Sequence, residues 1–218
     1  MKKKYKVIIF DWDGTIVNSI GLIVRVIKEA ALIKGIVLDD EKKYFSVIGL
    51  GLDQAFYRLF DFLSKQEIME LQKLYKELYL KNINEISLFD GIEFGLQDLY
   101  RRGYKLAIAT GKSRSGLDID LKQSGLQAFF SLTKTADECF SKPHPQMVNE
   151  ILDFYIAGKD EALIIGDSIY DLEMALNSGI DSLAVTFGAH SQEELLKYKP
   201  KAIVDNAYEI FEWIMRNE

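Results

Sequence analysis

The chain is poor in cysteine, proline and histidine. Its 218 residues include one cysteine, three prolines and two histidines. A single cysteine, Cys139, excludes an internal disulfide, so we expect a reducing compartment, the cytoplasm. No histidine stands beside Cys139 in the sequence. We therefore expect a small, buried or half-buried side chain at this position rather than a nucleophile.

Long apolar segments and an excess of positive charge are also absent. No stretch approaches the roughly 18 apolar residues of a membrane-spanning helix. The apolar run near the start is too short for the apolar region of a signal peptide. With 27 basic and 33 acidic residues the net charge is −6. Because lysines and arginines are not clustered, we expect neither nucleic acid nor a membrane as a partner.

Short apolar runs that end in polar residues recur along the chain. They occupy residues 6–13, 104–111, 130–137, 161–168, 182–188 and 201–206. Runs of this length are typical of strands buried on both faces of a parallel sheet. Apolar residues at helical spacing lie between several of them, in 91–103, 144–155 and 170–179. The alternation predicts an α/β fold with a Rossmann-like, doubly wound parallel sheet.

One interval interrupts this alternation. Residues 19–87 contain no good strand pattern, and apolar residues repeat at helical spacing over 19–35 and 64–82. We expect an all-α cap domain, residues 18–87, inserted into an α/β core domain formed by residues 1–17 and 88–218. A cleft between two domains is a favoured place for a small ligand.

Side chains capable of chemistry follow the predicted strands. They are Asp11, Asp13, Thr110, Gly111, Lys142, Asp167 and Asp171. Open α/β sheets bind ligands outside the carboxyl ends of their strands, where these residues would meet. Each alone has a structural explanation, because aspartate and glycine are common in turns and a serine such as Ser168 often caps a helix. Together, at successive strand ends, they predict one site.

Four of these stretches resemble a known family. In order they are "DWDGT" (11–15), "TG" (110–111), the lysine of "SKPHP" (Lys142) and "GDSIYD" (166–171). They are similar to the signatures of the haloacid dehalogenase superfamily of phosphatases. The expected helical insertion has the position of that family's first type of cap. Within the family the chain most resembles the phosphoglycolate phosphatase-like branch.

The resemblance implies a reaction and roles for the first two aspartates. It implies hydrolysis of a phosphomonoester of a small phosphorylated metabolite, with phosphoglycolate as the first candidate. Asp11 would be the nucleophile that forms an aspartyl-phosphate, and Asp13 the general acid and then the base that activates water. Gly14 and Thr15 would let the chain turn sharply toward the cap.

The remaining motif residues would bind the phosphoryl group and a metal ion. Thr110, Gly111 and Lys142 would contact the phosphoryl oxygens. Asp11 and Asp167 would ligate Mg²⁺, with Asp171 holding metal-bound water and the backbone carbonyl of Asp13 adding a ligand. Oxygen-only ligation favours Mg²⁺ over Zn²⁺. Converging carboxylates would also repel one another without a cation.

Several alternatives stay open at this stage. A phosphomutase would use the same two aspartates, and a non-catalytic binding protein could retain a relict site. Sequence also leaves open a monomer or a homodimer. Asn18 either caps the first cap helix or faces the substrate, and residues 49–51 either reach over the active site or form an ordinary turn. Lys112, Arg25 and Arg58 are the cations near the expected cleft that could meet an anionic substrate.

Overall fold

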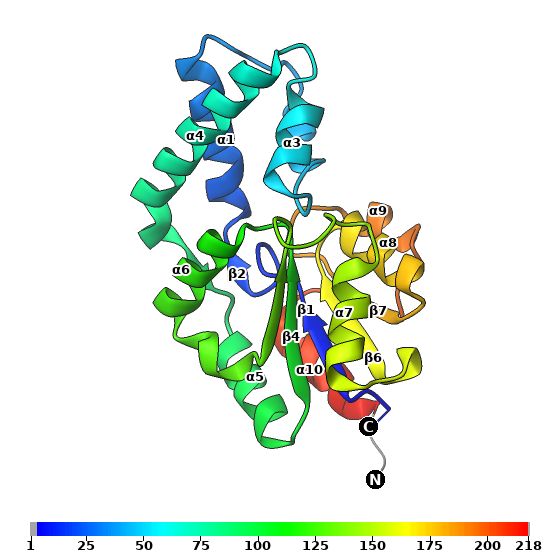
Figure 1. Cartoon of the computed structure of the whole chain (residues 1–218). Helices are drawn as coiled ribbons and strands as arrows, with labels where there is room; N and C mark the ends of the chain where they lie inside the picture. Colours follow the sequence, from blue (N-terminus) through cyan, green and yellow to red (C-terminus); the bar gives the residue numbers. More distant parts are fainter. Residues whose placement is uncertain (1–3, 218) are drawn as a thin grey trace.

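A six-stranded parallel sheet forms the centre of the protein. A computed structural model describes residues 4–217 and is shown in Figure 1. In spatial order the strands are β5 (Leu132–Thr135), β4 (Lys105–Thr110), β1 (Val7–Phe10), β6 (Ala162–Gly166), β7 (Asp181–Val185) and β8 (Ala202–Val204). Every neighbouring pair is parallel. The predicted Rossmann-like fold is confirmed, and β1 lies between β4 and β6, so the residues after these three strands are neighbours.

Helices cover both faces of the sheet. They are α5 (Ile92–Arg101), α6 (Arg114–Ser124), α7 (Gln146–Tyr155), α8 (Ile169–Ser178), α9 (Gln192–Leu196) and α10 (Ala207–Arg216). Short 3₁₀ turns are η1 (Ile83–Glu85), η2 (Leu126–Phe129) and η3 (Lys159–Glu161). Gly179 ends α8 in the left-handed conformation, which glycine adopts without strain.

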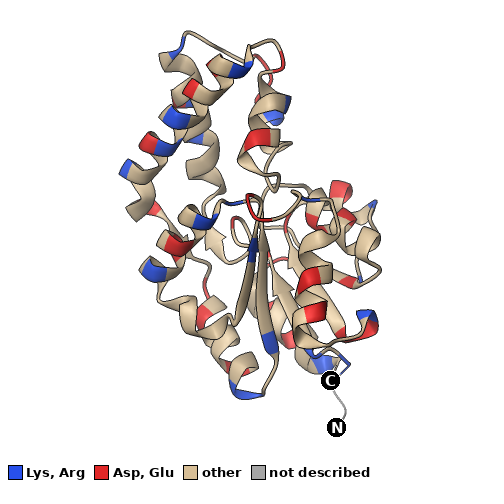
Figure 2. Cartoon of the chain, in the orientation of Figure 1, with Lys and Arg blue, Asp and Glu red and all other residues tan. Residues whose placement is uncertain are grey.

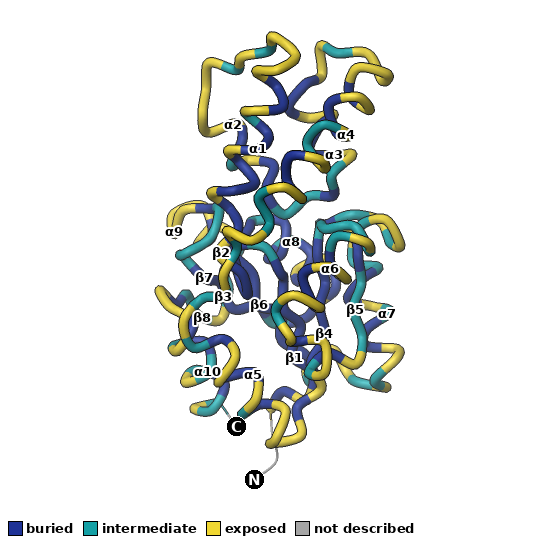
Figure 3. The backbone as a smooth tube through the Cα atoms, turned by 90° about the vertical axis from the view of Figure 1, so that its left-hand side faces the viewer, coloured by how far each residue is buried: buried dark blue, intermediate teal, exposed yellow. Residues whose placement is uncertain are grey.

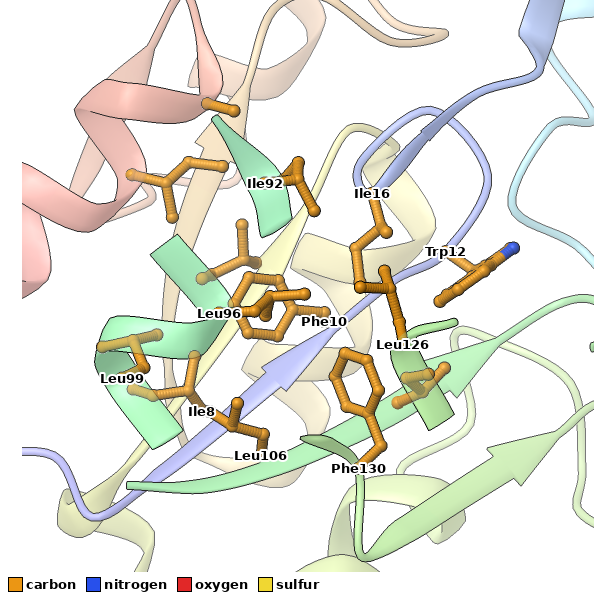
Figure 4. Packing of buried hydrophobic residues seen from close by; sticks show 14 of the residues in the cluster. Ile8, Phe10, Trp12, Ile16, Ile92, Leu96, Leu99, Leu106, Leu126 and Phe130 are labelled. Atoms are coloured by element: carbon orange, nitrogen blue, oxygen red, sulfur yellow. The ribbon is translucent and has the colours of Figure 1, made fainter. Parts of the chain in front are cut away.

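Successive side chains of β1 explain why the sheet has two helical layers. Ile8 and Phe10 belong to a buried cluster with residues of α5, α6 and α10 (Figure 4). Val7 and Ile9 point the other way and pack with residues of α7 and α8. Burying each such side chain stabilises the fold by roughly 1.5–3 kcal/mol. The strand is therefore buried between two helical layers, and Asp11 follows directly at its carboxyl end.

A group of helices stands above the carboxyl ends of the strands (Figure 1). It comprises α1 (Ile20–Ile33), α2 (Lys42–Phe45), α3 (Leu52–Leu59) and α4 (Lys65–Asn82). These helices, called the cap here, share a hydrophobic cluster of their own. Figure 3 shows buried backbone on the inner faces of the cap and in the sheet, and exposed backbone in the outer loops. Along α4, acidic and basic residues are interspersed (Figure 2).

Two short strands connect the cap to the sheet. β2 (Val17–Asn18) pairs antiparallel with β3 (Ser87–Leu88). Asn18 is exposed in β2 and does not cap α1, so the expectation that it is an N-cap is wrong. The chain stays extended through β2, and Ser19 occupies the position before the helix. Its hydroxyl donates to Asp13 Oδ1 at 2.7 Å instead of capping the helix.

Among residues 4–217, no helix is both long enough and apolar enough to cross a bilayer.

Candidate active site

Three carboxylates converge beside the carboxyl end of β1. Asp11 follows β1, Asp167 follows the adjacent β6, and Asp171 lies in the first turn of α8. One oxygen from each lies within 4.8 Å of the others. All three residues are buried. The parallel pairing of Phe10 with Ile165 brings the two strand ends level, which explains why residues so far apart in sequence meet.

Lys142 contacts two of these carboxylates. Its Nζ lies 2.7 Å from Asp11 Oδ1 and 2.6 Å from Asp171 Oδ1. Burial lowers the pKa of the Lys142 ammonium, but the charges of Asp11 and Asp171 outweigh it and raise that pKa. Lys142 therefore stays charged. One cation faces three acids, so the cluster still has an excess of negative charge.

The pKa values of the acids reflect this excess. Burial, followed by the charge of Asp171, raises the pKa of Asp11 well above its usual value. The same two causes raise the pKa of Asp167 to about 7. Asp11 Oδ1 is buried and accepts no hydrogen bond of good geometry in the described part of the chain. Buried carboxylate oxygens with too little positive charge around them fit a divalent cation.

The turn after β1 holds Asp167 in place. Thr15 Oγ1 donates to Asp167 Oδ1 at 2.9 Å, and the amide of Ala189 donates to Asp167 Oδ2 at 2.8 Å. Gly14 has a φ of 80°, and a Cβ there would lie 2.3 Å from Asp167 Oδ2. Only glycine fits both the backbone conformation and the space. The motif thus has two functions, a sharp turn and an oriented carboxylate.

Asp13 points away from the carboxylate cluster and contacts Lys112. Lys112 Nζ lies 3.1 Å from both oxygens of Asp13 and 3.2 Å from Asp120 Oδ2. It also donates to Tyr79 of the cap at 2.9 Å. Trp12 Nε1 donates to Asp120 Oδ2 at 2.9 Å. Sequence reasoning placed Lys112 near the substrate but did not anticipate its pairing with Asp13 and Asp120.

A cavity of about 190 Å³ lies between the sheet and the cap. Asp11, Asp13, Thr110 and Gly111 line its floor. The buried Lys142, Asp167 and Asp171 are not among its lining residues, but they adjoin Asp11. Seven predicted residues are therefore at the same end of the sheet, with Asp11 shared by the cavity and the carboxylate cluster.

The loop at residues 46–51 reaches over this site. A Cβ on Gly111 would lie 2.5 Å from the carbonyl oxygen of Leu50, so the two backbones touch. The amide of Gly51 donates to Ser141 Oγ at 2.7 Å, beside Lys142 in sequence. Of the two interpretations of residues 49–51, the geometry favours the one in which they cover the site. Asn18, in contrast, is not among the residues that line the cavity.

Comparison with known proteins agrees with this geometry. The family model for haloacid dehalogenase-like hydrolases matches residues 8–185. The chain belongs to this family. The match includes every motif residue from Asp11 to Asp171 and spans the cap helices.

Relatives of the haloacid dehalogenase-like family cover almost the whole chain. Probable phosphatase IndB of Dickeya dadantii is 31% identical over 211 residues, 93% of this chain and 90% of that protein. Pyrophosphatase PpaX of Bacillus cereus is 28% identical and covers 93% of both. The crystal structure of a predicted phosphoglycolate phosphatase from Haemophilus somnus superposes with a TM-score of 0.88 and 25% identity, covering 98% of this chain and 99% of that chain. The expected family and the expectation of a phosphatase are confirmed.

Proposed function

We propose that the protein is a Mg²⁺-dependent phosphomonoester hydrolase that acts on a small phosphorylated metabolite through an aspartyl-phosphate. One observation carries the proposal: Asp11 lines the cavity and also belongs to the buried carboxylate cluster. A nucleophile placed there would meet the phosphorus from the cavity side. Lys142, and a cation held by the carboxylate cluster, would neutralise the negative charge of the phosphoryl group.

Asp11 and Asp13 divide the covalent chemistry. An Asp11 oxygen forms a bond to phosphorus as the bond from phosphorus to the alcohol oxygen breaks, and Asp13 gives its proton to that oxygen. Asp13 then takes a proton from water, which attacks phosphorus and releases Asp11 and inorganic phosphate. Ser19 and Lys112 hold the Asp13 carboxylate in a fixed position for both proton transfers.

The residues at the ends of β1, β4 and β6 would bind the phosphoryl group and Mg²⁺. Asp11, Asp167 and Asp171 would hold the ion, which supplies positive charge near the phosphoryl oxygens. The carboxylate of Asp13 is engaged with Lys112 and Ser19, so its expected metal contact would be through the backbone carbonyl. Thr110 and Gly111 would donate to the phosphoryl oxygens from the cavity floor.

Phosphoglycolate and pyrophosphate are the first substrates to test. The names of similar proteins mention phosphoglycolate and pyrophosphate, and both compounds are small enough for a cavity of this kind. We place the reaction in the cytoplasm, because a chain with one cysteine has no disulfide to gain from an oxidising compartment.

Turnover of p-nitrophenyl phosphate by wild type and Asp11→Asn tests the proposal. We expect Mg²⁺-dependent turnover by the wild type, and a loss of at least about a thousandfold in Asp11→Asn because the nucleophile is gone. Asp153→Asn, at an exposed position on α7, is the matched control and should keep full activity. Rapid quenching with labelled substrate should trap phosphate on the wild type alone. Equal turnover by Asp11→Asn, with deamidation excluded by mass spectrometry, would refute the role of Asp11.

A further inference from the structure

The walls of the cavity are apolar where they come from the cap. Ile23 and Ile27 of α1, Phe56 of α3, and Tyr75 and Leu80 of α4 line it, together with Ile119 of α6. Leu80 and Ile119 are 50% and 41% exposed, so the apolar surface extends to the outer part of the lining. The floor, with Asp11 and Asp13, is the polar part of the cavity. A substrate with its phosphate on the floor would therefore place its organic group against apolar side chains.

Positive charge is scarce in these walls. Among the described residues that line the cavity, the basic ones are Lys76 and Lys112. Lys76 is exposed on α4. Lys112 already faces two carboxylates, those of Asp13 and Asp120. A second anionic group on the substrate would lose its water here and gain no free, buried counter-ion from the described lining.

The two cap arginines do not supply the missing charge. Arg25 pairs with Glu85 at 2.6 Å, and Arg58 donates to Tyr170 OH at 2.9 Å. Neither arginine lines the cavity. The sequence-based idea that one of them meets a second substrate charge has no support in this geometry.

We infer that the substrate is a phosphate monoester of an apolar alcohol, with an alkyl or aryl group and no second anionic group. The inference rests on the proposed function and narrows its substrate class. Phosphoglycolate and pyrophosphate each carry a second anionic group, so the inference excludes them as preferred substrates. The apolar group would bind between α1, α3 and α4, where each buried methylene improves binding by about fourfold.

A matched set of substrates tests this assignment in the wild type with Mg²⁺. Ethyl phosphate and pentyl phosphate differ only in methylenes. A third compound replaces the terminal methyl of pentyl phosphate with a carboxylate and keeps a similar leaving group. We expect kcat/KM for pentyl phosphate to exceed that for ethyl phosphate, and that for the carboxylate analogue, by at least about tenfold. Phosphoglycolate and pyrophosphate should also be poorer substrates than pentyl phosphate.

A charge placed in the cavity wall should weaken the preference. Leu80→Lys adds a second lysine to the lining, one turn from Lys76 and at a half-exposed position, so folding should be preserved. It should lower the ratio of kcat/KM for pentyl phosphate to that for the carboxylate analogue by about threefold to tenfold, because it removes apolar surface and adds a partly exposed counter-ion. Met69→Lys, on the same helix and 58% exposed but outside the lining, is the control and should leave this ratio unchanged.

The outcomes separate this inference from the proposed function. If the wild type hydrolyses p-nitrophenyl phosphate but prefers phosphoglycolate, pyrophosphate or the carboxylate analogue to pentyl phosphate, the apolar assignment is wrong and the phosphatase stands. An unchanged preference in Leu80→Lys would also overturn the assignment. If no monoester is hydrolysed at all, the proposed function itself fails.

Discussion

Lys112 Nζ lies 3.1 Å from both carboxylate oxygens of Asp13, and the same ammonium contacts Tyr79 of the cap at 2.9 Å. Three parts of the fold therefore meet at the Lys112 ammonium: the turn after β1, the loop after β4 and helix α4. Both Lys112 and Asp13 are largely buried, with side chains 10% and 15% exposed. The proposed proton donor is consequently held by a contact that depends on where the cap lies.

Replacing Lys112 tests whether this contact serves catalysis. Lys112→Met keeps the length of the side chain and removes its charge. We expect kcat to fall by at least about tenfold because Asp13 loses its fixed partner, and stability to fall by about 3–5 kcal/mol because two carboxylates are left buried without a cation. Urea unfolding and steady-state kinetics at saturating substrate measure the two effects separately. Lys122→Met, at an exposed position on α6, is the control. A folded Lys112→Met protein with unchanged kcat would contradict the positioning role.

Gly111 tests the contact between the loop after β4 and the loop of the cap. In Gly111→Ala the new methyl group would lie 2.5 Å from the carbonyl oxygen of Leu50 and 2.7 Å from that of Gly49. The cap loop must move, so we expect kcat/KM to fall by about a hundredfold, since displacements of about 1 Å have such effects. Gly21→Ala, where a methyl group meets nothing within 4 Å, should keep activity. Wild-type kinetics in Gly111→Ala would show that the loop does not need this close approach.

Thr15 tests the support of the proposed metal ligand. Thr15→Val removes the hydroxyl that donates to Asp167 Oδ1. We expect the Mg²⁺ concentration for half-maximal activity to rise by about tenfold to a hundredfold, because such supporting hydrogen bonds orient a ligand. At saturating Mg²⁺ most of kcat should return. Thr15→Ser, which keeps the hydroxyl, should restore the affinity, and calorimetric titration of Mg²⁺ gives a readout without turnover. An unaltered affinity in Thr15→Val would exclude this role.

Metal removal should make stability depend on pH. In the metal-free protein, burial and the charge of Asp171 raise the pKa of Asp167 from 3.8 to about 7. The native state therefore binds this proton more tightly than the unfolded state. Protonation of Asp167 therefore adds to the free energy of unfolding at low pH, and this contribution is lost as the pH rises from about 4 to about 7. Excess Mg²⁺ should reduce or abolish this loss, because it favours the ionised carboxylate. Urea unfolding across this range, with chelator and with Mg²⁺, would reveal the difference, and identical pH profiles would count against a cation at Asp167.

Much of the core was predictable because its strands are apolar on both faces. Each of the six apolar runs overlaps one strand of the sheet, although every strand ends before its run does, β1 and β7 by the widest margin, at Phe10 and Val185. Strand ends are harder to predict, since the pattern of apolar residues continues into the turn. Helix α6 gave a weak signal because its sequence, "RSGLDIDLKQS", is largely polar, with Leu117 and Leu121 as its buried apolar residues.

Site residues that belong to a sequence motif were predictable. Site residues that come together only through the packing of helices were not. Asp11, Asp167 and Asp171 meet as their positions after neighbouring strands imply. The partnership of Lys112 with Asp120 has no motif, because it depends on how α6 approaches the turn after β1. The apolar cavity wall is also a property of packing. Ile23 and Ile27 have the helical spacing of core residues, and only the arrangement of the helices shows that they face the cavity.

The pairing of β2 with β3 has a consequence for how such a protein can change. The chain enters the cap after β2 and comes back at β3, and Val17 and Leu88 are partners in this two-stranded ladder. The segment between these two residues therefore begins and ends at nearly the same point in space. A different set of helices can be inserted at that point without disturbing the order of the strands or the neighbours of Asp11. New substrates can therefore be acquired through the exchangeable part, while the strand ends that carry Asp11 and Asp167 keep their places.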